Sequence, residues 1–200
     1  MKNRLLLVTL LFVVTMSGCR KGPEDPFFSI YSREKRLCGD WFVYNCNYVY
    51  EEFKNQVSSY KQTMVFKNGV FTENFENSNI EYYGTYSYEY IINKNGTYKI
   101  NESLNYTKPH DTTLTRSEEG NWYFVDKNQS TNHKNKETVA FQPSSVIYSP
   151  TNTYTLKGYN PYFYDIIKLK NDEVKLNRSY SENQDTIVIK LNEDIDLLPK

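Results

Sequence analysis

Apolar and polar residues alternate in short runs along most of the chain beyond residue 38, and the spacers between the runs are rich in Asn and Gly. Alternation with a period of two is typical of strands that bury one face. The clearest hairpin turns lie at 67–69 and 93–96, because Asn and Gly tolerate the positive φ that such turns require. The pattern predicts strands at 41–50, 60–66, 70–75, 82–92, 97–106, 111–115, 121–125, 137–141, 146–148, 153–157, 162–169, 174–180 and 186–191.

Further turns are predicted at 117–120, 171–172 and 181–184, so the strands follow one another as an up-and-down meander. A meander leaves unpaired edges, and closure into a barrel removes them. We therefore expect an all-β fold, an antiparallel meander closed into a β-barrel of about 8 to 10 strands that is either packed inside or holds one small ligand. The barrel mouth is then the default binding site.

A short helix is predicted ahead of the first strand, over 26–36. Asp25 would be its N-cap and Pro26 its first helical residue. Arg33 and Arg36 suit its C-terminal end because cations stabilise the negative end of the helix dipole. Such a helix would form a lid or a spacer before the barrel.

The first eighteen residues have a different pattern. Lys2 and Arg4 precede an apolar run at 5–16, and the small residues Ser17 and Gly18 follow it. A basic start, an apolar stretch and a small-residue end are typical of a secretory signal peptide. The run is too short to span a hydrocarbon core, which needs about 20 residues.

The sequence at 16–19, Met-Ser-Gly-Cys, resembles the bacterial lipobox. The resemblance implies that Cys19 is lipidated, becomes the first residue of the mature protein and attaches it to a membrane, with more than one acyl chain needed for stable anchoring. Arg20 is compatible with delivery to the outer membrane, by similarity to Gram-negative lipoproteins whose retention signal is Asp. An ordinary secretory leader is the alternative. We expect a signal peptide at 1–18, a lipidated tether at 19–26 and one barrel domain at 27–200.

Gly39-Asp40-Trp41 resembles the Gly-x-Trp entry to the first strand of lipocalin-like domains, and similar Gly-led strand starts recur at 84–86, 96–98 and 120–122. This resemblance to bacterial lipoproteins with a lipocalin-like domain implies structural roles for Gly39 and Trp41. In that family the Trp packs across the closed barrel end under an Arg from a late strand, and Arg178 is the candidate. The alternative makes Trp41 a core aromatic and Arg178 a surface charge.

The charge balance argues against a nucleic-acid partner, and the cysteine spacing argues against a disulfide. Lys plus Arg equals Asp plus Glu, at 24 each, so no overall field attracts nucleic acid and no nucleic-acid partner is expected. Cys38 and Cys46 are eight residues apart on what reads as one strand. They would lie about 26 Å apart, whereas a disulfide needs Cα atoms within about 7 Å. We predict two unpaired thiols, most simply acting as small buried hydrophobes.

The sequence offers no recognisable catalytic or metal site. His110 and His133 lie in polar stretches without the three or four ligands of a zinc site. The carboxylate pairs at 51–52, 118–119 and 194–196 read as solvated faces rather than as a catalytic pair. We therefore expect no cofactor, no metal and no enzyme, although a hydrolase remains open if distant polar groups converge in a cleft.

The chain has 19 tyrosines, and four of them are the strongest candidates for ligand contacts. Tyr82, Tyr86, Tyr88 and Tyr90 share one face of a strand, where they line a cavity, form an outer contact patch or pack in the core. The leading hypothesis is a lipid-anchored, non-enzymatic barrel that binds a small apolar or amphipathic ligand or serves as an envelope component. The alternative is a β-sandwich module that binds a glycan or an envelope protein through its aromatic face.

Overall fold

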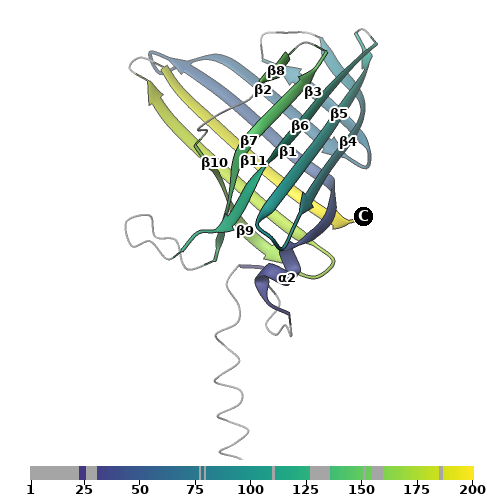
Figure 1. Cartoon of the computed structure of the whole chain (residues 1–200). Helices are drawn as coiled ribbons and strands as arrows, with labels where there is room; N and C mark the ends of the chain where they lie inside the picture. Colours follow the sequence, from purple (N-terminus) through teal and green to yellow (C-terminus); the bar gives the residue numbers. More distant parts are fainter. Residues whose placement is uncertain are drawn as a thin grey trace, which may run out of the picture.

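The computed structural model describes residues 23–25, 31–76, 78, 80–109, 111–126, 136–150, 152–154, 160–184 and 187–200. Within these residues one short helix precedes eleven strands (Figure 1). No helix in the described part of the chain is long and apolar enough to cross a membrane. The elements are α2 (Arg33–Leu37), β1 (Gly39–Lys54), β2 (Val57–Lys67), β3 (Val70–Phe75), β4 (Glu81–Ile92), β5 (Thr97–Lys108), β6 (Thr112–Phe124), β7 (Thr138–Ser149), β8 (Asn152–Tyr154), β9 (Tyr162–Leu169), β10 (Val174–Gln184) and β11 (Ile187–Pro199).

Ten strands, β1 to β7 and β9 to β11, close into an antiparallel barrel of lipocalin-like architecture. Neighbours in sequence pair from β1 to β7, β7 then pairs with β9, and β11 completes the ring by pairing with β1 along its whole length. Strand β8 pairs only with the far end of β7. The predicted all-β barrel with a short N-terminal helix is confirmed, and the sandwich alternative is wrong because one sheet closes on itself.

The barrel is narrower at the end where α2 lies (Figure 1). There, residues 39–42 of β1 pair directly with the end of β4, so eight strands (β1, β4 to β7 and β9 to β11) form the ring. From Asn45 onward β1 pairs with β2 instead, and the β2–β3 hairpin widens the other half. In this wide half β7 and β10 also part, because β9 pairs only with 138–141 of β7 and 174–177 of β10.

Apolar side chains fill the narrow half. Trp41 is 3% exposed, and its indole N–H donates to the backbone oxygen of Leu37 over 2.9 Å. Gly39 lies beside the same indole ring. Both residues therefore lie at the narrow end of the barrel. The fully buried neighbours at this end include Leu37, Ile92, Ile100, Phe141, Leu169, Val174, Leu176 and Leu197.

A β-bulge in β1 changes which of its residues face inward. Val43 pairs with Leu197 and Asn45 with Asp196, so Tyr44 is an extra residue with no partner on β11. The sequence places Trp41 and Cys46 on opposite faces, yet both are buried, because the bulge shifts the alternation by one position.

Two predicted turns and one predicted gap between strands lie inside continuous strands. The stretch at 117–120 belongs to β6, 142–145 to β7 and 181–184 to β10. Gly120 marks a bulge rather than a turn: a Cβ there would lie 2.1 Å from the backbone oxygen of Gln142 on β7. Glycine is therefore required for close strand approach at this position.

The helix begins later than predicted. Its N-cap is Ser32, whose hydroxyl accepts from the Lys35 N–H, and residues 26–30 lie outside the described residues. Asp25 is not the N-cap. Its carboxylate pairs with buried Arg33 and accepts from the backbone N–H of Leu169 over 2.7 Å. Arg36 donates to the backbone oxygen of Leu169, so the helix is fastened to the end of β9.

Both described cysteines are free, which confirms the prediction of unpaired thiols. Cys38 is the C-cap of α2 rather than a strand residue, and Cys46 is buried on β1. Burial raises the pKa of the Cys46 thiol far above its usual value. The thiol is therefore protonated at neutral pH and packs as a small hydrophobe.

Candidate functional site

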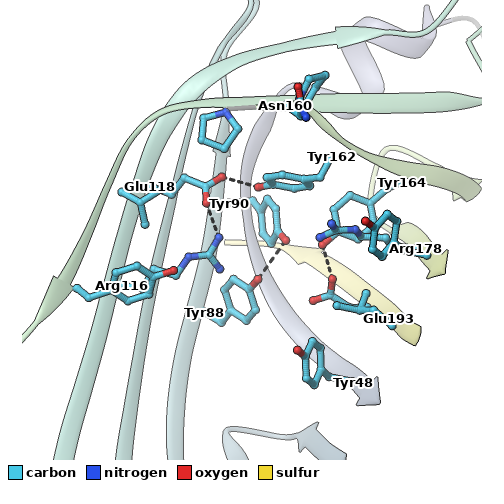
Figure 2. Close-up of a pocket in the computed structure, with 16 residues that line it drawn as sticks. Tyr48, Tyr88, Tyr90, Arg116, Glu118, Asn160, Tyr162, Tyr164, Arg178 and Glu193 are labelled. Atoms are coloured by element: carbon cyan, nitrogen blue, oxygen red, sulfur yellow. Dashed lines mark hydrogen bonds and ion pairs between the residues drawn. The ribbon is translucent and has the colours of Figure 1, made fainter. Parts of the chain in front are cut away.

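The wide half of the barrel contains a partly open cavity of about 760 Å³ at the place where β7 and β10 part (Figure 2). Its walls come from seven barrel strands (β1, β4, β6, β7, β9, β10 and β11) and from the segment that leads into β9. The lining residues include Tyr48, Tyr88, Tyr90, Arg116, Glu118, Val146, Tyr162, Tyr164, Arg178, Leu191 and Glu193.

Strand alternation supplies these residues in pairs two positions apart. Tyr88 and Tyr90 come from β4, Arg116 and Glu118 from β6. The register of the last strands then brings three more side chains into one row. Glu193 of β11 faces Arg178 of β10 on one side and Tyr48 of β1 on the other.

Glu118 is the centre of a closed polar network on one side of the cavity (Figure 2). It is 1% exposed, and one of its oxygens accepts from the hydroxyls of Tyr98 at 2.6 Å and Tyr162 at 2.5 Å. The other oxygen pairs with Arg116, whose guanidinium also lies 3.6 Å from Glu102. Burial raises the pKa of Tyr98, and the bond to Glu118 raises it further, so the hydroxyl keeps its proton.

Glu193 and Arg178 lie on the opposite side of the cavity (Figure 2). Glu193 accepts from the Tyr164 hydroxyl over 2.5 Å. Burial raises the pKa of Glu193, although the Tyr164 hydroxyl and the charge of Arg178 lower it. Burial also raises the pKa of Tyr48 to about 12, and the neighbouring Glu193 adds to the effect. Tyr48 is therefore a neutral donor at physiological pH.

A smaller chamber of about 180 Å³ adjoins the main cavity. The two share Tyr48, Tyr88, Arg116 and Glu193, and Cys46 lies only in the smaller one. The remaining walls of the smaller chamber are Gln62, Met64, Phe66 and Glu102. Arg116 therefore lines both spaces, and its buried Nε has no hydrogen-bond partner among the described residues.

The predicted tyrosines divide between two environments. Tyr88 and Tyr90 line the cavity with rings stacked 5.4 Å apart and hydroxyls 3.2 Å apart. Tyr86 donates its hydroxyl to backbone oxygens of β1 near the bulge, and Tyr82 packs edge-on against Phe75 and Tyr106. Neither Tyr82 nor Tyr86 lines the main cavity.

The predicted packing of Arg178 on Trp41 is wrong. Trp41 faces Pro199 at the narrow end, whereas Arg178 faces Glu193, which lies beside Tyr48, seven residues farther along β1. The surface-charge alternative is also wrong, because Arg178 lines the cavity.

Cys19, His110 and His133 lie outside the described residues. Among the residues that are described, no three His, Cys, Asp or Glu side chains gather in a way that could hold a metal ion.

Sequence reasoning misses the charged residues of the cavity because it assigns polar side chains to the solvent-facing side of a strand. Glu118 does not belong to a solvated pair: it shares its face of β6 with buried Gly120 and Trp122. Glu193 likewise lies between Leu191 and Ile195 on the inward face of β11. A charged residue within an inward-facing alternation was the signal in the sequence that could have found both.

The arrangement combines aromatic walls with a few fixed polar groups, which is the usual composition of small-molecule sites. Both oxygens of Glu118 are engaged, so this carboxylate is poorly placed to take up a proton from a ligand. A scan of protein-family models, a search of curated proteins and a search of solved structures each found no match to this chain.

Proposed function

We propose that the protein is a lipid-anchored, non-enzymatic lipoprotein of the outer membrane whose barrel binds one small apolar or amphipathic molecule. The observation that carries this proposal is the cavity itself. Its volume of about 760 Å³ lies in the range of about 300–1,000 Å³ that is typical of sites for small ligands. The buried residues Tyr88, Tyr90 and Tyr164 belong to the core and also form part of the wall, so the cavity adjoins the packed core.

The composition of the walls supports an amphipathic ligand. The rings of Tyr88, Tyr90 and Tyr164 are each less than 10% exposed and supply apolar surface, while Arg178 and Glu193 supply polar contacts on one side. A molecule with an apolar body and one polar end fits such a division. The anchored address is supported separately by the leader and by Cys19 in its lipobox-like setting.

Two substitutions on adjacent positions of β7 test the binding function. Val146 is buried and lines the cavity, whereas Ile147 is exposed on the other face of the strand. We expect Val146→Trp to occupy part of the cavity and to abolish a small-molecule adduct in native mass spectrometry of the full chain purified from a Gram-negative host. Ile147→Trp should keep the adduct, since it adds the same ring outside the barrel.

A wild-type protein that carries no adduct and binds no member of an amphiphile library would contradict the proposal. The near-ultraviolet circular dichroism of both variants controls for folding. If Val146→Trp folds and keeps the same adduct as Ile147→Trp, the ligand binds elsewhere and the cavity is not the site.

A further inference from the structure

Arg178 differs from every other described arginine because its N–H donors have no hydrogen-bond or ion-pair partner among the described residues. Arg33 pairs with Asp25, Arg36 donates to the Leu169 backbone oxygen, and Arg116 pairs with Glu118 and Glu102. Arg178 has no ion pair or hydrogen bond within the described residues, although Glu193 faces it on the next strand. Its donors are therefore available to a molecule in the cavity that it lines.

The position of the guanidinium is fixed by an aromatic ring. Its central carbon lies 5.0 Å from the centroid of the Tyr162 ring, and the Tyr162 hydroxyl is held by Glu118 over 2.5 Å. A guanidinium packed over an aromatic face keeps its N–H groups along the edge, where they can bind a carboxylate through two parallel bonds. The site is thus organised before a ligand arrives.

The negative charges of the cavity are already engaged, which argues against a cationic ligand. Glu118 receives two hydroxyls and Arg116, and Glu102 lies beside the same arginine. Glu193 accepts from Tyr164, and its burial favours the neutral carboxyl. Among the described residues that line the cavity, the charge left without a partner is therefore the positive charge of Arg178.

We propose that the cavity selects ligands that carry a carboxylate, which Arg178 binds while the tyrosine rings hold an apolar body. This inference rests on the proposed binding function and deepens it by naming the ligand class. A neutral or cationic ligand of the same shape would leave the guanidinium without an acceptor in a partly buried space, which is unfavourable.

Three probes with one apolar body and different ends test the inference: 2-naphthylacetate, 2-naphthylethanol and 2-naphthylethylamine. The full chain is reconstituted in lipid nanodiscs, and binding is measured by isothermal titration calorimetry against empty nanodiscs. We expect the acetate to bind about tenfold or more tightly than the alcohol or the amine, in line with a charge-assisted hydrogen-bonded pair.

Variants on β10 assign the selectivity to one residue. Arg178→Gln should lower the affinity for the acetate to that for the alcohol and leave the affinity for the alcohol unchanged. Arg178→Lys should restore part of the preference, because it keeps the charge but loses the planar fork. Lys175→Gln is the matched control, since Lys175 lies on the same strand near Glu173 and Asp196 and does not line the cavity.

The outcomes separate the inference from the function. Equal binding of all three probes, or tighter binding of the amine, overturns the carboxylate inference and leaves the binding function standing. Binding of none of the probes, together with no adduct in native mass spectrometry, overturns both. Loss of acetate and alcohol binding to the same extent in a folded Arg178→Gln variant also overturns the inference, because Arg178 would then shape the cavity rather than bind the carboxylate.

Discussion

At the residue scale, tyrosine hydroxyls satisfy the buried carboxylates of the barrel. Tyr98 and Tyr162 donate to Glu118, and Tyr164 donates to Glu193. The two carboxylates still differ, because Glu118 also has Arg116 as an ion-pair partner and Glu193 has no arginine within ion-pair distance among the described residues. Burying the ionised carboxylate therefore costs more free energy for Glu193 than for Glu118. This difference leads to a prediction about how stability depends on pH.

We expect Glu193→Gln to raise the melting temperature at pH 7.5 by a few degrees and to change it little at pH 4. The folded-state pKa of Glu193 is raised by burial, so the native state binds this proton more tightly than the unfolded state. Stability is therefore lost as pH rises from the ordinary carboxyl range through the raised folded value. Glutamine removes that loss and still accepts from the Tyr164 hydroxyl.

Thermal unfolding of both proteins across this pH range is the measurement. Glu81→Gln is the control, because Glu81 is exposed at the start of β4 and should show no such trend. A pH-independent difference between Glu193→Gln and wild type would mean that the pKa of Glu193 is the same in the folded and unfolded states, which contradicts the prediction.

At the element scale, strand continuity depends on glycines that allow close approach between neighbours. Gly120 in β6 and Gly84 in β4 each lie so that a Cβ would come within about 2 Å of a backbone oxygen on the next strand. These contacts involve backbone, which cannot move aside as a flexible side chain can. Both glycines lie at register shifts of the ladder.

We predict that Gly120→Ala lowers the free energy of unfolding by about 1–3 kcal/mol or more, as expected for overpacking against backbone. Urea denaturation followed by tryptophan fluorescence measures the change, since Trp122 lies on the same strand. Thr115→Ala, at an exposed position of β6, should change the free energy by less than about 0.5 kcal/mol. An equally small effect of Gly120→Ala would show that β6 and β7 can separate locally without cost.

The hairpins at 67–69 and 93–96 were predictable because their turns are set by local residues, Asn and Gly at positive φ. The continuous course of β6 was not, because Gly120 is needed for a contact with β7, 22 residues later. The same limit applies to the cavity. Glu118 follows the regular inward alternation of β6, but the space it faces depends on where β7 and β10 part, and the ring on which Arg178 packs depends on which strands meet.

At the scale of the whole molecule, the two halves of the barrel have different compositions. The narrow half is closed by eight strands around Trp41 and contains the apolar core, while the wide half contains the charged and tyrosine-lined cavity. The segment that leads from the predicted lipidation site joins the narrow half, because Asp25 is bound to Arg33 and Leu169 there.

Metabolic labelling with palmitate tests the anchor. We expect the wild-type chain to incorporate label and to partition with membranes, whereas Cys19→Ala should incorporate none and be recovered without membrane attachment. Cys38→Ala is the matched control, because Cys38 caps α2 and lies outside the leader. Label that persists in Cys19→Ala would remove the lipid anchor from the proposed function.

The attachment of Asp25 to the end of β9 sets the length of the tether. Only six peptide steps separate Cys19 from Asp25, and a fully extended chain spans at most about 20 Å over that distance. With acyl chains on Cys19, the narrow end would be held close to the lipid head groups, and the place where β7 and β10 part would lie in the half away from the bilayer. A ligand would then enter from the aqueous phase rather than by lateral transfer out of the membrane.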